Sequence, residues 1–352
     1  MAYQDVFVSG RINPESPYDT FRIPAICRTE KGTLLAFAEG RRSVSDQSSN
    51  VIVLRRRLST SKDWEPMQVV VKDEPASLNN PCVIASTEGT VWMTYQRYPQ
   101  GFHERNTVPG IDPERSCLTF IVSSKDEGKT WSTPIDISRS IKGKETQSDA
   151  AGPGAGIELQ RGPHKGRLIF PFNEVAKGQY NVYCIYSDDQ GRTWNRGTTP
   201  AKAAEFQPNE TQIAECADGT ILMNCRNQAA GNHRLQTVSR DGGQTWEPIV
   251  ARLDLVDPVC QGALISLNDK RGTLVFSNPA DSKSRVNGRL RVSRDNGKTW
   301  SEGVSIEPGS FAYSALCPLA GNKVGVLFET VADLGGGREG YRIRYAEMEI
   351  EP

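Results

Sequence analysis

The sequence predicts an all-β fold, a six-bladed β-propeller of four-stranded antiparallel blades. Three observations favour it: a polar turn motif recurs along the chain, apolar runs alternate with a period of two residues, and no long amphipathic helical pattern occurs. A hairpin signature at regular intervals is typical of one blade per repeat. Blades of about 55 residues would give six blades in 352 residues.

The recurring motif reads S-x-D-x-G-x-T-W, and four segments match it without a mismatch. They begin at Ser124, Ser187, Ser239 and Ser293, so that consecutive starts are 63, 52 and 54 residues apart. The aspartate can accept hydrogen bonds from backbone amides of the turn, and the glycine allows a positive φ. We interpret the motifs as hairpin turns that stabilise the fold, with each tryptophan packed between sheet layers. A fifth segment, 59–64, keeps the serine, aspartate and tryptophan but lacks the glycine and threonine.

Alternating apolar runs predict the strands. Those that precede the motifs are 118–122, 180–186, 235–238 and 290–292, and the others are 33–38, 51–54, 90–95, 167–172, 219–224, 273–277, 323–329 and 342–350. Ring closure requires the last run, or an N-terminal strand at 6–9, to complete a shared blade. We therefore expect one domain spanning residues 1–352.

Composition excludes several classes of protein. The chain has 42 Lys and Arg against 42 Asp and Glu, so no charge surplus favours nucleic acid or an anionic membrane as a partner. No apolar stretch approaches the ~20 residues of a membrane span. The N-terminus lacks a signal-peptide pattern, so we expect a cytoplasmic protein, or a secreted one if a signal peptide has been removed.

The eight cysteines form no C-x-x-C pair, and the chain has three histidines. Zinc motifs need ligands clustered at short spacing. We therefore expect small buried core cysteines in a reducing compartment, with no metal and no cofactor.

Polar residues that a blade repeat does not require fall in four places. The first two lie near the N-terminus. Arg22 occupies the segment FRIP at 21–24, where an arginine is costly to bury without an anionic partner. The polar stretch 37–50 contains Glu39, Arg41, Arg42 and Asp46.

The other two places lie further along the chain. Glu210 follows Asn209, and the strand after it delivers Arg226 to a strand end, where loops carry function. The segment 278–285 ends in Arg285, and Tyr313 lies among small residues just before an apolar run. Each residue alone also fits a rim or core role.

Together these features resemble the exo-α-sialidases (neuraminidases) of glycoside hydrolase family 33. The resemblance extends from Tyr3 to Glu349. It rests on FRIP, the four aspartate boxes, LLAFAEGR at 34–41, Asn80-Pro81-Cys82, Gly152-Pro153-Gly154, Cys260-Gln261-Gly262 and Ala312-Tyr313-Ser314.

The resemblance implies a role for each candidate residue. Arg22, Arg226 and Arg285 would hold the substrate carboxylate, with Arg289 and Arg291 as competitors for the third place. Asp46 would be the acid/base, Tyr313 the nucleophile and Glu210 its partner. Arg41, Asn80 and Gln261 would line the pocket.

The chemistry of sialic acid explains these residue types, since its anomeric carbon carries a carboxylate. Guanidinium groups bind a carboxylate through parallel charge-assisted hydrogen bonds. A neutral phenol avoids the repulsion that an anionic nucleophile would meet there, but it needs a base. We expect the arginines to favour phenolate character in Tyr313, and the reaction to retain configuration.

The expected activity is hydrolysis of terminal α-linked sialic acid from oligosaccharides, glycoproteins or gangliosides by a monomer. A trans-sialidase or an intramolecular, anhydro-forming sialidase would share the same intermediate. A non-catalytic sialoglycan-binding propeller is an alternative of another class, as is a glycosidase with paired carboxylates. The sequence does not indicate linkage preference.

Overall fold

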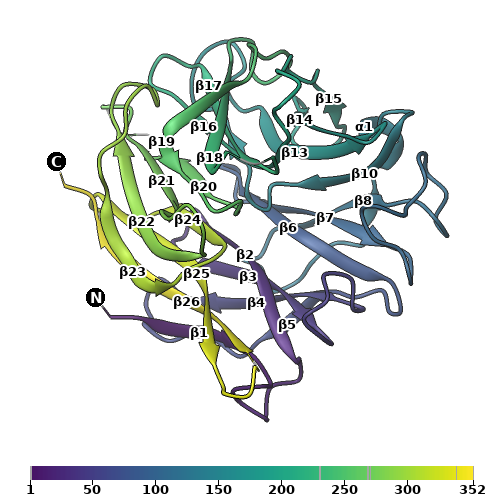
Figure 1. Ribbon diagram of the computed structural model, residues 1–352, viewed down its shortest axis with the longest axis vertical. Helices are drawn as coiled ribbons and strands as arrows, with labels where there is room; N and C mark the ends of the chain where they lie inside the picture. The colour runs from purple at the N-terminus through teal and green to yellow at the C-terminus, as the bar shows by residue number, and fades with distance from the viewer. Residues whose placement is uncertain (1, 230, 268, 270, 338, 352) are drawn as a thin grey trace.

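A computed structural model describes residues 2–229, 231–267, 269, 271–337 and 339–351. Six β-sheets are arranged as blades around a central axis, which confirms the predicted propeller (Figure 1). Within the described residues the single helix is α1 (Ser138–Ile141), and no helix there is long and apolar enough to cross a membrane.

The first three blades are formed by residues 20–196. The first contains β2 (Thr20–Arg28), β3 (Leu34–Arg41), β4 (Val51–Arg57) and β5 (Gln68–Val71). The second contains β6 (Ser77–Ala85), β7 (Val91–Tyr98), β8 (Leu118–Ser124) and β9 (Ile135–Asp136). The third contains β10 (Thr146–Ala151), β13 (Leu168–Ala176), β14 (Gln179–Ser187) and β15 (Asn195–Arg196).

The other three blades follow the same plan. The fourth contains β16 (Pro208–Glu215), β17 (Ile221–Asn227), β18 (His233–Ser239) and β19 (Val250–Val256). The fifth contains β20 (Ala263–Ser266), β21 (Leu274–Pro279), β22 (Val286–Ser293) and β23 (Val304–Ser310). The sixth contains β24 (Ser314–Pro318), β25 (Lys323–Asp333), β26 (Glu339–Glu349) and β1 (Gln4–Val8).

Two blades gain a short fifth strand that the sequence did not predict. β11 (Gly154–Ala155) pairs parallel with β6, and β12 (Ile157–Glu158) pairs antiparallel with β13. Both come from the segment that runs from β10 to β13 and crosses between two blades.

The N-terminal strand closes the ring. β1 pairs antiparallel with β26, so that Gln4 lies opposite Tyr345 and Val8 opposite Arg342. Figure 1 shows the purple start of the chain beside its yellow end. The expected shared blade is therefore present, and it ties the two ends of the chain together.

The aspartate boxes form the predicted turns. In the first box the Thr130 amide and hydroxyl donate to the two carboxylate oxygens of Asp126, at 2.9 and 2.6 Å. The Ser124 hydroxyl donates to the same carboxylate (2.8 Å) and accepts from the amide of Gly128, whose φ is +76°. These hydrogen bonds lower the pKa of Asp126 to about 2. The same pattern recurs at Asp189, Asp241 and Asp295.

The box tryptophans pack between blades, as expected. Trp131 follows β8 but meets Phe37 of the first blade edge-on, with ring centroids 5.8 Å apart. Trp194 of the third blade meets Trp92 of the second in the same manner, at 6.5 Å. These two boxes therefore stabilise their own turns and also the contact with the preceding blade.

The eight cysteines are all buried and none forms a disulfide bond, as expected for core residues. Burial raises the pKa of several of their thiols, for example that of Cys216 to about 11, which keeps these groups in the unreactive neutral form.

The aspartate box makes a stability prediction. Asp126→Ala removes the acceptor of the turn's hydrogen bonds and should lower the free energy of unfolding by about 1–2 kcal/mol, measured by urea denaturation. The matched control is Asp63→Ala in the degenerate box, because among the described residues no hydrogen bond reaches the Asp63 carboxylate. Equal losses in the two variants would contradict this role.

The lowered pKa of Asp126 also predicts a pH dependence. The folded-state pKa of about 2 lies below the ordinary value of about 3.9, so the box stabilises the protein fully above the ordinary value. This contribution should disappear as the pH falls toward 2. The difference in unfolding free energy between wild type and Asp126→Ala should therefore shrink on acidification. A constant difference would show that the ionised Asp126 carboxylate does not stabilise the box.

Candidate active site

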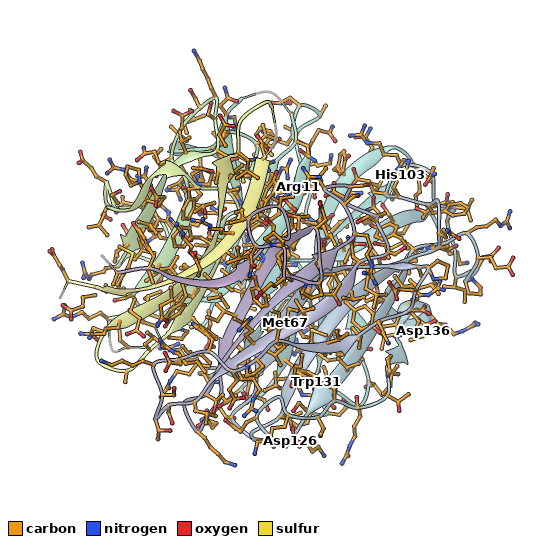
Figure 2. All side chains as sticks on the ribbon, turned by 90° about the horizontal axis from the view of Figure 1, so that it is seen from below. Arg11, Met67, His103, Asp126, Trp131 and Asp136 are labelled. Carbon is orange, nitrogen blue, oxygen red and sulfur yellow. The ribbon has the colours of Figure 1, made fainter. Side chains whose placement is uncertain are left out.

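A cavity of about 500 Å³ lies at one end of the propeller axis, where the inner strands β2, β6 and β16 begin and the chain enters β24. This volume is within the range of small-molecule sites. His103 lies on its wall, and Figure 2 shows His103 far from the box residues Asp126 and Trp131. The boxes thus lie away from the cavity, as expected for folding elements.

Arg22 enters this cavity from β2. Its Nε donates to Glu329 Oε1 at 2.8 Å, and the carboxylate of Glu329 is fully buried. The same oxygen accepts the amide of Ile23 at 2.7 Å, where the backbone has a φ of +61°. A positive φ is unusual for a β-branched residue. Glu329 thus supplies the anionic partner that a buried arginine needs, and it also holds the strained turn.

Arg226, Glu210 and Tyr313 form one hydrogen-bonded triangle. The Tyr313 hydroxyl donates to Glu210 Oε1 at 2.6 Å, and Arg226 Nη1 donates to the Tyr313 oxygen at 3.0 Å. Arg226 Nη1 also donates to Glu210 Oε2 at 2.7 Å. The three residues come from β16, from β17 and from just before β24, so only the closed ring brings them together.

Arg285 also lies close to Tyr313. The guanidinium carbons of Arg285 and Arg22 lie 5.5 and 5.2 Å from the Tyr313 ring centroid. Arg289 and Arg291 do not line the cavity, and they donate instead to the carbonyls of Gly303 and Ser301 beside β23. The geometry therefore favours Arg285 as the third arginine.

The Tyr313 phenol is held in its neutral form. Burial raises its pKa well above the ordinary value, and Glu210 raises it further, whereas Arg226 and Arg285 lower it. The arginines thus favour phenolate character, as expected, but they do not produce a phenolate in the free protein. Burial and one close carboxylate outweigh the arginines, so a proton acceptor is needed, and Glu210 is in place to be one.

Asp46 reaches the cavity from the loop after β3. Its side chain is 72% exposed and accepts a hydrogen bond from Arg41 Nη1 at 2.8 Å. Its backbone oxygen accepts from the side-chain amides of Asn50 and Asn79, at 2.6 and 2.7 Å. Partial desolvation in the cavity raises the pKa of Asp46, but the attraction and hydrogen bond of Arg41, with the attraction of Arg22 and Arg285, together outweigh it, so the pKa lies below the ordinary value.

Arg41 bridges two carboxylates. It is almost fully buried and pairs with the buried Glu39 at 2.6 Å as well as with Asp46. Glu39 also accepts the backbone amide of Asn80 at 2.7 Å. Arg41 and Asn80 both line the cavity, but Arg41 already has two protein partners and helps to hold the Asp46 loop.

Gln261 is not on the cavity wall, in contrast to the expectation. Its side chain is buried, donates to the carbonyl of Ser314 and accepts the Ser314 amide, each at 3.0 Å. Both ends of the Gln261 side-chain amide therefore form hydrogen bonds with backbone groups. Gln261 therefore lies behind Tyr313 and fixes the residue that follows it.

Sequence reasoning missed Glu329 and gave no role to Glu39. Glu329 ends an apolar run, and a carboxylate in such a run is a sign of a buried partner. It also missed the segment 103–105, which adds His103, Glu104 and Arg105 to the wall from the loop between β7 and β8. No pattern in that loop distinguishes it from ordinary surface sequence.

The arrangement can bind an anion and activate a phenol. Three guanidinium groups surround one tyrosine, with a carboxylate against its hydroxyl and a second, exposed carboxylate nearby. No group of three or more His, Cys, Asp or Glu side chains suited to a metal ion occurs within the described ranges.

Comparison with known proteins identifies the family. Residues 32–326 match the family described as the BNR repeat-like domain. The chain belongs to the BNR repeat-like domain family.

Two relatives of this BNR repeat chain carry the name sialidase. The sialidase of Micromonospora viridifaciens is 31% identical over 362 aligned positions, which cover 99% of this chain and 53% of the relative. The sialidase of Bacteroides fragilis (strain YCH46) is 30% identical over 335 positions, covering 88% of this chain and 60% of the relative. The chain thus spans between half and two thirds of these relatives.

A solved structure has the same fold. The Hadza microbial sialidase Hz136 superposes with a TM-score of 0.82 at 24% identity, covering 95% of this chain and 66% of that one. At this identity the likeness concerns the fold alone.

The Arg41 bridge makes a prediction about Asp46. Arg41→Gln removes the attraction that lowers the Asp46 pKa, so that pKa should rise to or above the ordinary value of about 3.9, measured by NMR titration of the carboxyl carbon. The pKa of Glu39 is already raised by burial, so the Glu39 carboxylate can take up a proton when Arg41, its ion-pair partner, is replaced.

The matched control is Arg42→Gln, because the neighbouring Arg42 pairs with Glu74 at 2.9 Å and not with Asp46. An unchanged Asp46 pKa in Arg41→Gln, or the same rise in Arg42→Gln, would show that the bridge does not set this pKa.

Proposed function

We propose that this chain is the catalytic propeller of a retaining exo-α-sialidase, which hydrolyses terminal α-linked sialic acid from glycans. One observation carries the proposal. The Tyr313 hydroxyl lies 2.6 Å from a carboxylate and 3.0 Å from one arginine, while two further arginines flank its ring. A phenol with a base and three cations around it suits attack on a carbon that carries a carboxylate.

The substrate carboxylate binds to Arg22, Arg226 and Arg285. Guanidinium groups offer it parallel charge-assisted hydrogen bonds. Arg226 also has a buried Nε that finds no acceptor among the described residues. Bound there, the carboxylate holds the anomeric carbon next to Tyr313 and keeps the sugar in one orientation.

Tyr313 attacks the anomeric carbon and forms a sialyl-tyrosine bond. Its proton passes to Glu210, which already accepts its hydrogen bond. The neutral phenol avoids repulsion with the substrate carboxylate, which an aspartate or glutamate nucleophile would experience. A tyrosine nucleophile is the known exception among retaining glycosidases.

Asp46 protonates the departing glycosidic oxygen as its bond to the anomeric carbon breaks. The exposed Asp46 then takes a proton from water, which attacks the anomeric carbon of the intermediate. The bond to Tyr313 breaks, and Glu210 returns its proton to the departing tyrosine oxygen. Two displacements at one carbon retain its configuration. Because the pKa of Asp46 is lowered in the free protein, a smaller fraction of it is in the acid form at a given pH than for an ordinary aspartate, and lowering the pH increases that fraction.

The names of the two relatives support the activity, and sialylated oligosaccharides, glycoproteins and gangliosides are the proposed substrates. A non-catalytic sialoglycan-binding propeller would not need the carboxylate at 2.6 Å from Tyr313. A glycosidase with paired carboxylates would leave the three arginines without a role.

The test is release of fluorophore from a 4-methylumbelliferyl sialoside. Wild type should turn the substrate over, and Tyr313→Phe should lose nearly all of that activity. Asp46→Ala should lose about 10²–10⁴-fold on 3′-sialyllactose but much less on the fluorogenic substrate, because its phenolate leaving group needs no proton. Equal losses on both substrates would contradict the acid role.

Arg285→Ala and Arg289→Ala form a matched pair. Loss of activity in the first and not in the second is expected, and the reverse would contradict the assignment of the third arginine. Binding of sialic acid by folded wild type without turnover would favour the binding-protein alternative. NMR of the product separates free sialic acid, released as the α-anomer, from an anhydro or a transferred product.

A further inference from the structure

Arg285 differs from the other two cavity arginines in how it is held. Arg22 pairs with Glu329 and Arg226 with Glu210. In the described part of the chain no carboxylate pairs with Arg285. Its guanidinium donates instead, through Nη2, to the backbone oxygen of Val259 at 3.4 Å. The placement of this cation therefore depends on a backbone turn.

That turn is strained. Val259 has a φ of +59°, a left-handed conformation that a β-branched residue adopts only when its surroundings impose it. Cys260, the next residue, packs with Ile23, Ala312 and Tyr313 in one apolar cluster. The turn thus serves both the third arginine and the floor beneath the tyrosine.

A buried ion pair imposes this conformation. Asp257 accepts the amide of Cys260 at 2.8 Å, and Arg234 donates to the carbonyl of the same residue at 2.5 Å. The two side chains pair with each other at 3.1 Å, with 0% and 1% of their surfaces exposed. Both hydrogen-bonding groups of Cys260 are thereby fixed by charged side chains.

The same pair reaches the strand that carries Arg226. Arg234 Nε donates to Asn224 Oδ1 at 2.8 Å. Asn224 lies on β17 two residues before Arg226, and side chains two apart on a strand point to the same face. Asn278, on β21, donates to the backbone oxygen of Val256 at 2.8 Å and to Asp257 at 3.3 Å.

We propose that Arg234 and Asp257 are positioning residues that set the separation of the Arg226 and Arg285 guanidinium groups. Neither lines the cavity. They act by locking the Val259–Cys260 turn to β17, so that two cations from different blades meet the two oxygens of one carboxylate. The identity of the ligand, a substrate carboxylate, rests on the proposed function. The effect on the separation of the two guanidinium groups does not.

The first test is Arg234→Lys. Lysine keeps the positive charge beside Asp257, but a single ammonium group cannot serve Asn224, Asp257 and the Cys260 carbonyl together. The Kd for a didehydro sialic acid, which carries the carboxylate but is not hydrolysed, should rise about 10–100-fold, since small misplacements of binding groups are costly.

The matched control is Arg167→Lys. Arg167 is a second buried arginine, with a carboxylate partner (Asp188, 2.7 Å) and a carbonyl partner (Gly242, 3.0 Å), and it does not line the cavity. The Arg167→Lys substitution should lower the melting temperature and leave the Kd for the didehydro sialic acid unchanged. A wild-type Kd in Arg234→Lys, or an equal rise in the control, would overturn the proposal.

A geometric measurement separates this inference from the proposed function. In crystals of Arg234→Lys, the guanidinium carbons of Arg226 and Arg285 should change their separation by more than about 0.5 Å. An unchanged separation overturns positioning even if the protein is a sialidase. Absence of sialoside binding by wild type overturns the proposed function, and the crystal measurement still decides the positioning role.

If Arg234→Lys does not fold, the double variant Arg234→Met with Asp257→Asn replaces it. No unpaired charge is then left buried, so folding should be kept, and the asparagine retains an acceptor for the Cys260 amide. The same change in separation is expected, and a wild-type separation in this variant overturns the proposal.

Discussion

Three guanidinium groups share one cavity at the end of the propeller axis, and their mutual repulsion is the constraint on which the rest of the site depends. Like charges a few ångströms apart repel strongly where water is excluded. Two carboxylates offset part of this repulsion: Glu329 beside Arg22 and Glu210 beside Arg226. Within the described chain Arg285 has a backbone oxygen as its hydrogen-bond acceptor and no carboxylate partner, so its charge is the one that a bound anion would offset.

The propeller fold satisfies this constraint because each charged group comes from a different place in the ring. The inner strands lie around the axis, and residues near the starts of β2, β6 and β16, with Tyr313 just before β24, line one cavity. Glu329, from the last blade, lies 307 positions from Arg22 along the chain. The pairing of β1 with β26 holds the two ends of the chain together. The charge pairs of the site therefore form only when the ring of blades is closed.

Tyr313 lies where these demands meet. Its hydroxyl is shared between Glu210 and Arg226, and the guanidinium groups of Arg22 and Arg285 lie close to its ring. Burial keeps the phenol neutral, so Tyr313 adds no negative charge to the cavity in the free protein. Gln261 and the Val259–Cys260 turn support the tyrosine from behind.

Local sequence alone determined the box turns, the two middle strands of each blade and the N-terminal strand β1. The box hydrogen bonds span four residues, as from Asp126 to Thr130, and strand alternation needs only neighbours, so both can be predicted from short segments. The inner strands β6, β10, β16, β20 and β24 were not predicted, because polar and small residues interrupt their apolar pattern. The outermost strands β5, β9, β15, β19 and β23 were also not predicted, because they are short or largely exposed.

The tertiary structure decided which polar residues share a site. The sequence analysis preferred Arg285 but left Arg289 and Arg291 as competitors. The direction of β22, together with the turn at Val259, brings only Arg285 to the cavity. Glu329 and Arg234 act on residues from distant segments or neighbouring strands, and Gln261 turns away from the cavity because the backbone of Ser314 uses both ends of its amide. Ion pairs between blades depend on distances in the folded structure, and these distances cannot be read from the spacing of residues along the chain.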